Sequence, residues 1–207
     1  MSLLSHEALN AALAVEPLEE RLTIMPMLDP QQQVGPASID VRLGTRFRVL
    51  RRTDESGIDP AAHSQGALER GQQHVTVGFG RPIWLHPGQF VLGSTLEFLR
   101  FPAQLGGYVV GRSSWGRVGL LVATAIMIQP GFAGNLTLEL VNQGEGPIAL
   151  YAGCRIAQLA IHALDAPTAQ AYTGKYVGPT GPQVTRLAKE AADIERLKEV
   201  GDRLAGI

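Results

Sequence analysis

The sequence predicts an all-β barrel or sandwich with one helix at each end of the chain. Short segments of alternating or wholly apolar residues follow one another closely between residues 75 and 163. Turn-forming groups such as His86-Pro87-Gly88 and Pro130-Gly131 separate them. Many short strands at close, regular spacing are typical of barrels and sandwiches. The 24 glycines and 13 prolines would supply the tight turns that such a fold needs.

The elements follow in order from the periodicity of apolar residues. Ser5–Val15 predicts a short helix with its serine as the cap. Strand patterns come next at Ser38–Leu43 and Arg46–Leu50, and the polar, turn-rich residues Arg51–Gln73 predict a surface excursion. The remaining expected strands are Val75–Phe79, Ile83–Leu85, Phe90–Leu99, Leu105–Val110, Leu120–Ile128, Asn135–Asn142, Ile148–Tyr151 and Ile156–Ala163.

The C-terminus has a different character from the strands before it. In Thr185–Leu204, apolar residues fall near helical spacing among Lys, Glu, Asp and Arg, which predicts an amphipathic helix packed on a neighbour. We therefore expect a main domain over residues 1–186 and a helical extension over residues 187–207.

Composition excludes several classes of protein. A formal net charge of −1 gives no basic face for nucleic acid. The sequence contains no run of about 18 apolar residues, so it predicts no membrane span. The N-terminus lacks the pattern of a signal peptide, and we therefore expect a cytoplasmic protein. Cys154 is the single cysteine, which excludes internal disulfides and Cys-cluster metal sites. The five histidines are scattered, and none is paired at metal-ligand spacing.

The stretch Gly111-Arg-Ser-Ser-Trp-Gly-Arg-Val-Gly-Leu120 carries the strongest functional signal. It sets two arginines, two serines and two terminal glycines between apolar runs, and Pro130–Gly134 and Glu139 follow soon after. Guanidinium groups pair bidentately with phosphate oxygens, and serine hydroxyls and loop N–H groups complete such a cradle. The pattern predicts a nucleotide site with a carboxylate nearby.

The sequence leaves two structural interpretations open for each of three residues. Asp40 lies between Ile39 and Val41, so its carboxylate is either on a costly buried face or on an ordinary exposed one. Glu139 shares a strand face with Thr137, opposite the leucines, which a solvent-facing strand would also show. Trp115 is either a core anchor or part of a ligand pocket.

Five segments in order carry a family resemblance. They are Pro36–Gly44, His86–Glu97, Gly111–Leu120, Pro130–Glu139 and Lys175–Gly181. Together they resemble the dCTP deaminases, relatives of the trimeric dUTPases, over roughly residues 1–186. The resemblance implies a distorted β-barrel or jelly-roll-like subunit of the dUTPase type.

The resemblance also implies how such a protein assembles and what it binds. It implies a homotrimer with active sites between subunits, which binds dCTP or dUTP together with Mg²⁺, with dTTP as a candidate inhibitor. Deamination in this family needs no zinc. Composition supports that point independently, because one cysteine and no Pro-Cys-x-x-Cys run cannot form the site of a zinc deaminase.

The resemblance assigns a role to each residue of the expected site. Glu139 is the general base and acid, and Ser113, Arg117 and the carbonyl of Ala125 hold the attacking water. Arg112 and Ser114 contact phosphates, and the backbone of Thr137 and Leu138 reads the pyrimidine edge. The full set of expected substrate-binding residues is Arg112, Ser113, Ser114, Trp115, Gly116, Arg117, Gln129, Thr137, Leu138, Glu139, Tyr172, Lys175 and Pro179.

Two residues depart from the family pattern, and a nearby segment is one residue shorter than usual. Gln129 stands where the family usually has an aspartate. The resemblance also implies that the main domain ends in a nucleotide lid, and Pro179 stands where that lid usually has a glutamine. The principal expectation is deamination of dCTP to dUTP and ammonia. A bifunctional enzyme giving dUMP, a dUTPase, and a non-catalytic nucleotide-binding regulatory protein are the alternatives.

Overall fold

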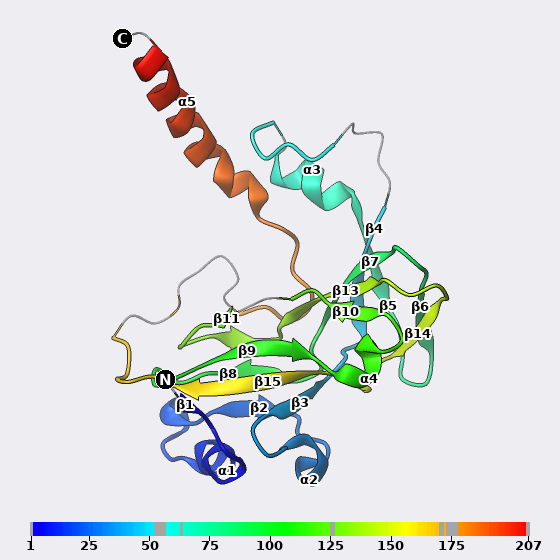
Figure 1. The fold of residues 1–207 in the computed structure, drawn as a ribbon, viewed down its shortest axis with the longest axis vertical. Helices are drawn as coiled ribbons and strands as arrows, with labels where there is room; N and C mark the ends of the chain where they lie inside the picture. The colour runs from blue at the N-terminus through cyan, green and yellow to red at the C-terminus, as the bar shows by residue number, and fades with distance from the viewer. Residues whose placement is uncertain are drawn as a thin grey trace. The chain divides into compact units, whose positions relative to one another are not determined.

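The computed structural model is mainly β and describes residues 2–51, 57–62, 64–124, 127–169, 172 and 178–205. Its strands form two five-stranded sheets, one three-stranded sheet and one two-stranded sheet among these residues (Figure 1). None of the sheets closes into a barrel in this part of the chain. The predicted mainly β, jelly-roll-like class is confirmed, in the form of separate, distorted sheets.

The first sheet is arranged around β15 (Arg155–Ala163), its longest strand. On one side β15 pairs with β9 (Leu105–Gly111), which in turn pairs with β11 (Met127–Ile128). On its other side it pairs with β1 (Ser2–Leu3) and β3 (Ile39–Arg42). All these pairings are antiparallel, and the register shifts between Arg155 and Ala157 on β15. Residues at the start of β15 thus lie between β3 and the end of β9.

The second sheet has the strand order β10-β13-β7-β4-β5. Its members are β10 (Leu120–Val122), β13 (Thr137–Asn142), β7 (Phe90–Ser94), β4 (Arg46–Leu50) and β5 (Gln72–Thr76). The three-stranded sheet consists of β12 (Ala133–Gly134), β8 (Phe98–Arg100) and β2 (Thr23–Met25), and β14 (Ile148–Tyr151) pairs with β6 (Pro82–Leu85). β3 and β4, the strands on either side of Gly44, therefore belong to different sheets. In the core, the apolar side chains of Leu43, Phe47 and Leu140 lie around Gly93.

Short helices connect these sheets. α1 (His6–Ala14) is capped by Ser5, whose Oγ accepts from the N–H of Ala8, so the predicted N-terminal helix and cap are confirmed. The helices not expected from the sequence are α2 (Pro30–Gln33), α3 (Gln65–Arg70), α4 (Ser113–Gly116), and the 3₁₀ turn η1 (Leu18–Glu20). All span six residues or fewer, too short for apolar periodicity to mark them.

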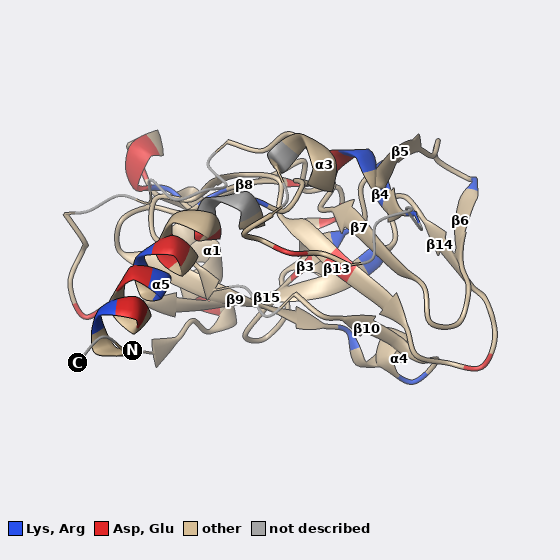
Figure 2. Cartoon of the chain, turned by 90° about the horizontal axis from the view of Figure 1, so that it is seen from above, with Lys and Arg blue, Asp and Glu red and all other residues tan. Residues whose placement is uncertain are grey.

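The chain divides into two compact units, one formed by residues 1–48 and 74–183 and the other by residues 49–73 and 184–207. The second unit contains α3 and the C-terminal helix α5 (Ala191–Ala205), which follows the 3₁₀ turn η2 (Leu187–Glu190). Lys, Arg, Asp and Glu alternate along α5 (Figure 2), while Leu197 and Leu204 are exposed. The amphipathic helix is confirmed, starting later than expected, and its packing on a neighbour stays a prediction. No described helix is both long and apolar enough to cross a membrane.

Two of the predicted strands are divided in the structure. Phe90–Leu99 becomes β7 and β8, because the chain leaves the second sheet at Ser94 and β8 pairs instead with β2 and β12. Leu120–Ile128 becomes β10 and β11, which belong to different sheets. A continuous apolar run does not reveal where a strand passes from one sheet to another.

Gly119 forms the tight connection between α4 and β10. Its φ is +89°, and a Cβ atom there would lie 2.4 Å from the backbone nitrogen of Gly144. The N–H of Gln143 donates to its carbonyl at 2.8 Å. α4 is therefore fixed beside the end of β13 by a contact that only glycine permits.

Gly119→Ala should lower the free energy of unfolding by about 1–3 kcal/mol, through left-handed backbone strain and the clash with Gly144. Chemical denaturation would measure the loss. Gly116→Ala is the matched control, because a Cβ at that helical position meets no atom within 4 Å. Equal losses in the two variants would contradict this account of the turn.

Candidate functional site

The predicted phosphate loop contains the one-turn helix α4. β9 ends at Gly111, Arg112 is the N-cap residue, and Ser113 and Ser114 open the helix. The side chains of both serines and of Arg117 are exposed, whereas Arg112 and Trp115 are half-buried. The loop therefore presents two hydroxyls and one guanidinium to solvent.

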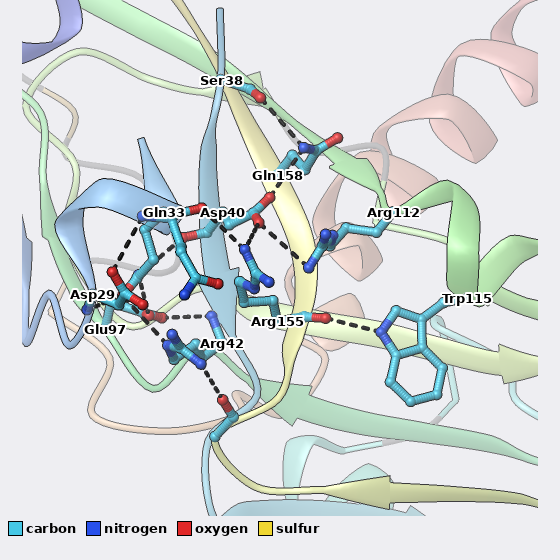
Figure 3. Close-up of polar contacts among 12 residues, drawn as sticks. Asp29, Gln33, Ser38, Asp40, Arg42, Glu97, Arg112, Trp115, Arg155 and Gln158 are labelled. Atoms are coloured by element: carbon cyan, nitrogen blue, oxygen red, sulfur yellow. Dashed lines mark hydrogen bonds and ion pairs between the residues drawn. The ribbon is translucent and has the colours of Figure 1, made fainter. Parts of the chain in front are cut away.

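Arg112 is held by a carboxylate of its own chain. Its Nη1 lies 3.3 Å from Oδ2 of Asp40, and Nη1 of Arg155 lies 3.2 Å from the same oxygen. The Nε2 of Gln158 donates to Oδ1 of Asp40 at 3.0 Å. Only 7% of the Asp40 side chain is exposed, so its carboxylate is on the buried face that the sequence left open (Figure 3).

Trp115 is hydrogen-bonded to Arg155, one of the partners of Asp40. Its indole N–H donates to the carbonyl oxygen of Arg155 at 2.9 Å (Figure 3). Trp115 thus behaves as an anchor, one of the two interpretations that the sequence allowed. A contact between its ring and a ligand stays a prediction.

Glu139 lies on β13, whose exposure alternates as the sequence predicts. Leu138 and Leu140 are buried, whereas Thr137 and Glu139 are half-buried on the opposite face. Burial raises the pKa of the Glu139 carboxyl above its ordinary value, and no positive group contributes to the shift. Among the described residues, none forms a hydrogen bond or ion pair with this carboxylate that would oppose the effect.

Within one chain, the strand register separates Arg117 from Glu139. Leu120 pairs with Asn142, three residues beyond Glu139, which is roughly 10 Å along an extended strand. α4 lies beyond Leu120, beside Gly144. Burial alone therefore accounts for the raised pKa of Glu139 inside one chain, without an opposing effect of Arg117.

The backbone around Glu139 favours Thr137 over Leu138 as a reader of a base edge. The N–H of Glu139 donates to Oγ1 of Thr124 at 2.6 Å, and its carbonyl accepts from the N–H of Ala123 at 2.7 Å. Because backbone groups alternate along a strand, Leu138 points its N–H and C=O to β7, and Thr137 points them the opposite way.

The Gln129 turn and Tyr172 lie close together. The N–H of Phe132 donates to the carbonyl of Gln129, and the side chain of Gln129 is exposed. Tyr172 donates its N–H to the carbonyl of Pro130 at 3.2 Å, and its ring centroid is 6.4 Å from that of Phe132. Two residues distant in the sequence are thus brought to one turn, as a shared ligand would require.

Pro179 is buried against the start of β13. Its carbonyl accepts from the N–H of Asn135 at 2.8 Å, and a Cβ on Gly134 would lie 2.3 Å from its Cδ. A ring in this position fills space that the backbone of Gly134 leaves open. The predicted contacts of Ala125 and Lys175 lie outside the described residues.

A buried carboxyl that the sequence did not single out supports the start of β13. Glu97 is fully buried and accepts from the backbone N–H of Arg42 at 2.8 Å and from Nε2 of Gln33 at 3.2 Å. Its carbonyl accepts from Asn135 and from Thr95, whose Oγ1 accepts from the N–H of Leu136. Burial raises the pKa of the Glu97 carboxyl to about 7, although the hydrogen bonds from Arg42 and Gln33 to the carboxylate act to lower it.

Comparison with known proteins places this arrangement in a family. The sequence model of the dCTP deaminase-like family matches residues 4–164. The chain belongs to this family. The enzyme class and the resemblance inferred from five motifs are thereby confirmed.

Several relatives of this dCTP deaminase-like protein have assigned activities. A dUMP-forming dCTP deaminase of Dictyoglomus thermophilum is 41% identical over 174 residues, covering 82% of this chain and 88% of the relative. A dCTP deaminase of Natronomonas pharaonis is 42% identical over 174 residues, with the same coverage of 82% and 88%. The crystal structure of 2′-deoxycytidine 5′-triphosphate deaminase from Agrobacterium tumefaciens matches with a TM-score of 0.57 and 26% identity, over 76% of this chain and 45% of that longer chain.

The buried Glu97 gives this dCTP deaminase-like protein a predictable pH dependence of stability. Its pKa is raised from 4.5 to about 7 on folding, so the folded state binds the proton more tightly than the unfolded chain. Stability from this group is therefore complete below about pH 4.5 and is lost as the pH rises toward 7.

Between about pH 5 and about pH 8, the free energy of unfolding should fall by about 2 kcal/mol more in the natural chain than in Glu97→Gln. Denaturant unfolding at fixed protein concentration would measure both. Glu7→Gln is the control, since the pKa of this exposed carboxyl is lowered, chiefly by a backbone hydrogen bond. Parallel pH profiles for the natural chain and Glu97→Gln would show that Glu97 does not titrate in this range.

Proposed function

We propose that this protein hydrolyses dCTP to its deaminated nucleotide and ammonia, with Glu139 as general base and acid. The observation that carries the proposal is the state of Glu139. It is a half-buried carboxyl, its pKa is raised by burial, and no described residue of its own subunit is paired with it. A base with a raised pKa is suited to exchanging protons near neutral pH.

The reaction requires several proton transfers around one carbon atom. Glu139 removes a proton from water, which attacks C4 of cytosine, and the proton is delivered to N3. Proton transfer to the amino group then allows it to leave as ammonia while the C4 carbonyl forms. Ser113, Arg117 and the carbonyl of Ala125 position the water, and Arg117 stabilises the negative charge that develops on the attacking oxygen.

Phosphate binding is proposed for the exposed part of the α4 loop. The hydroxyl of Ser114 and the N–H groups of Arg112 that are not turned to Asp40 contact the triphosphate, together with Tyr172 and Lys175. Mg²⁺ enters with the nucleotide through phosphate oxygens, since the loop offers serine and arginine side chains and no carboxylate. The ion, when bound, neutralises phosphate charge.

Assembly as a homotrimer is part of the same proposal. Because the register separates Arg117 from Glu139 within one chain, a neighbouring subunit would supply the α4 loop to each Glu139. The main domain of residues 1–186, its lid, the extension of residues 187–207 and a cytoplasmic location likewise remain proposals.

For the final product, dUMP is favoured over dUTP. The names of relatives such as the dUMP-forming enzyme of Dictyoglomus thermophilum favour it, at 41% identity. Gln129 acts against a fast second step, because an amide cannot take a proton from the water that attacks the α-phosphate. We therefore expect dUTP to appear first, followed by dUMP and pyrophosphate.

Glu139→Gln should lower the rate of ammonia release from dCTP by about 10²–10⁴-fold, because the amide cannot shuttle protons. A coupled ammonia assay would measure it. Arg117→Ala should also be inactive, and co-refolding the two variants should restore activity, since mixed trimers contain intact sites. Unchanged ammonia release by Glu139→Gln would contradict the mechanism. Co-refolded trimers that remain inactive would contradict a site shared between subunits.

Gln129→Asp should raise the rate of dUTP conversion to dUMP, relative to the rate of deamination, by about 10-fold or more, because it restores a carboxylate base. Separation of nucleotides over time in dCTP and Mg²⁺ would follow both steps. Gln129→Asn, which keeps an amide, is the matched control. Equal dUMP rates in all three chains would show that residue 129 takes no part in the second step.

A non-catalytic nucleotide sensor is the second candidate, favoured by Gln129 and the buried Pro179. It predicts thermal stabilisation of the natural chain by dCTP or dTTP without any product. The same nucleotide separation distinguishes it from the enzyme.

A further inference from the structure

We infer that Asp40 is a positioning residue that fixes α4 in the orientation in which its exposed side chains meet a nucleotide. The inference deepens the proposed function and rests on it. It concerns residues that hold the loop in place, as distinct from residues that contact the substrate.

The first observation is the number of partners that Asp40 has. One carboxylate, 7% exposed, receives Arg112 at 3.3 Å, Arg155 at 3.2 Å and Gln158 at 3.0 Å. Gln158 also donates to Oγ of Ser38 at 3.3 Å, and Arg155 donates to the carbonyl of Gln32 at 3.0 Å. A buried charge with several donors holds its partners in one geometry, because any other arrangement leaves it unpaired.

The second observation is the position of those partners on α4 and β15. Arg112 is the N-cap residue of α4, and its side chain reaches across β15 to Asp40 on β3 (Figure 3). The register supports this path, since Gln158 on β15 is opposite both Asp40 and Val110. The irregularity between Arg155 and Ala157 turns Arg155 toward the same carboxylate.

The third observation is a second attachment of the same helix. The indole N–H of Trp115 donates to the carbonyl of Arg155, the residue whose side chain contacts Asp40. α4 is therefore attached at two half-buried residues, its N-cap Arg112 and Trp115 in the helix itself. Ser113, Ser114 and Arg117, which remain exposed, are oriented by these two attachments.

The geometry assigns Arg112 a structural role that precedes any phosphate contact. Its Nη1 is already paired with Asp40, a carboxylate of the protein itself. Loss of Asp40 would leave Arg112 without its carboxylate and Arg155 with only the carbonyl of Gln32, so α4 would be attached through Trp115 alone and could shift. A small displacement of positioning groups is enough to weaken a ligand site strongly.

The test uses Asp40→Asn in the full chain, with Trp84→Phe so that Trp115 is the single tryptophan. In the absence of nucleotide, we expect the Trp115 emission to move to longer wavelength, because the indole loses its fixed hydrogen bond and gains water. In a Glu139→Gln background, which prevents turnover, calorimetry should show that the Kd for dCTP with Mg²⁺ rises by about ten-fold or more.

Asp193→Asn is the matched control. It is the same substitution in an exposed Asp paired with Arg196 at 3.7 Å on α5, and it should change neither reading. Arg112→Met provides a second variant should Asp40→Asn fold poorly, since the pair of Asp40 and Arg155 remains. It too should shift the Trp115 emission in the free protein, which a residue that only contacts phosphate would not do.

The outcomes separate this inference from the proposed function. Unchanged Trp115 emission in both Asp40→Asn and Arg112→Met would overturn it, as would a shifted emission with an unchanged Kd. If the Glu139→Gln parent binds no dCTP, the proposed function fails. The Trp115 emission then still decides whether Asp40 holds α4.

Discussion

The antiparallel pairing of β15 with β3 on one side and β9 on the other is the constraint on which the site depends. A strand hydrogen-bonded on both edges cannot slip by one residue without turning every side chain to the opposite face. Its register sets Gln158 opposite both Asp40 and Val110, and so brings the end of β9 to the buried carboxylate. α4 begins where that strand ends. The second sheet adds Glu139 through an equally fixed register between β10 and β13.

Three carboxyl groups of this molecule differ in how deeply they are buried and in how many hydrogen-bond donors surround them. Two carboxyls, Asp40 and Glu97, are almost wholly buried, and each has several donors around it. Glu139 is half-buried and lacks such donors among the described residues, so the energetic cost of its burial remains in its raised pKa. The first two carboxyls are held by their donors, and the third is the one whose proton affinity is raised by burial alone. This contrast is what distinguishes a candidate base from structural acids in the same fold.

Much of the fold follows from the sequence, because strand alternation and cap chemistry are local. β4, β14 and the cap of α1 agree with residues that can be identified by eye. For the candidate site, the alternation that sets Glu139 on the face opposite Leu138 and Leu140 agrees with the sequence, while the roles of Ser113 and Glu139 stay predictions. Burial of Asp40 was not, since Ile39 and Val41 are buried as well and a strand covered on both faces shows no alternation. Glu97 was missed because its donors, Gln33 and the backbone of Arg42, are distant in the chain and carry no pattern of their own.

The separation of Arg117 from Glu139 along the sheet has a consequence beyond the architecture of one subunit. A chain that holds its candidate base within β13 and the α4 loop beyond the far end of that strand would carry halves of two different sites. If neighbours complete them, catalysis becomes a property of the assembled population, and dilution below the dissociation constant of the assembly would switch it off without unfolding any chain. Protein abundance would then act as a control on nucleotide turnover, in addition to substrate supply.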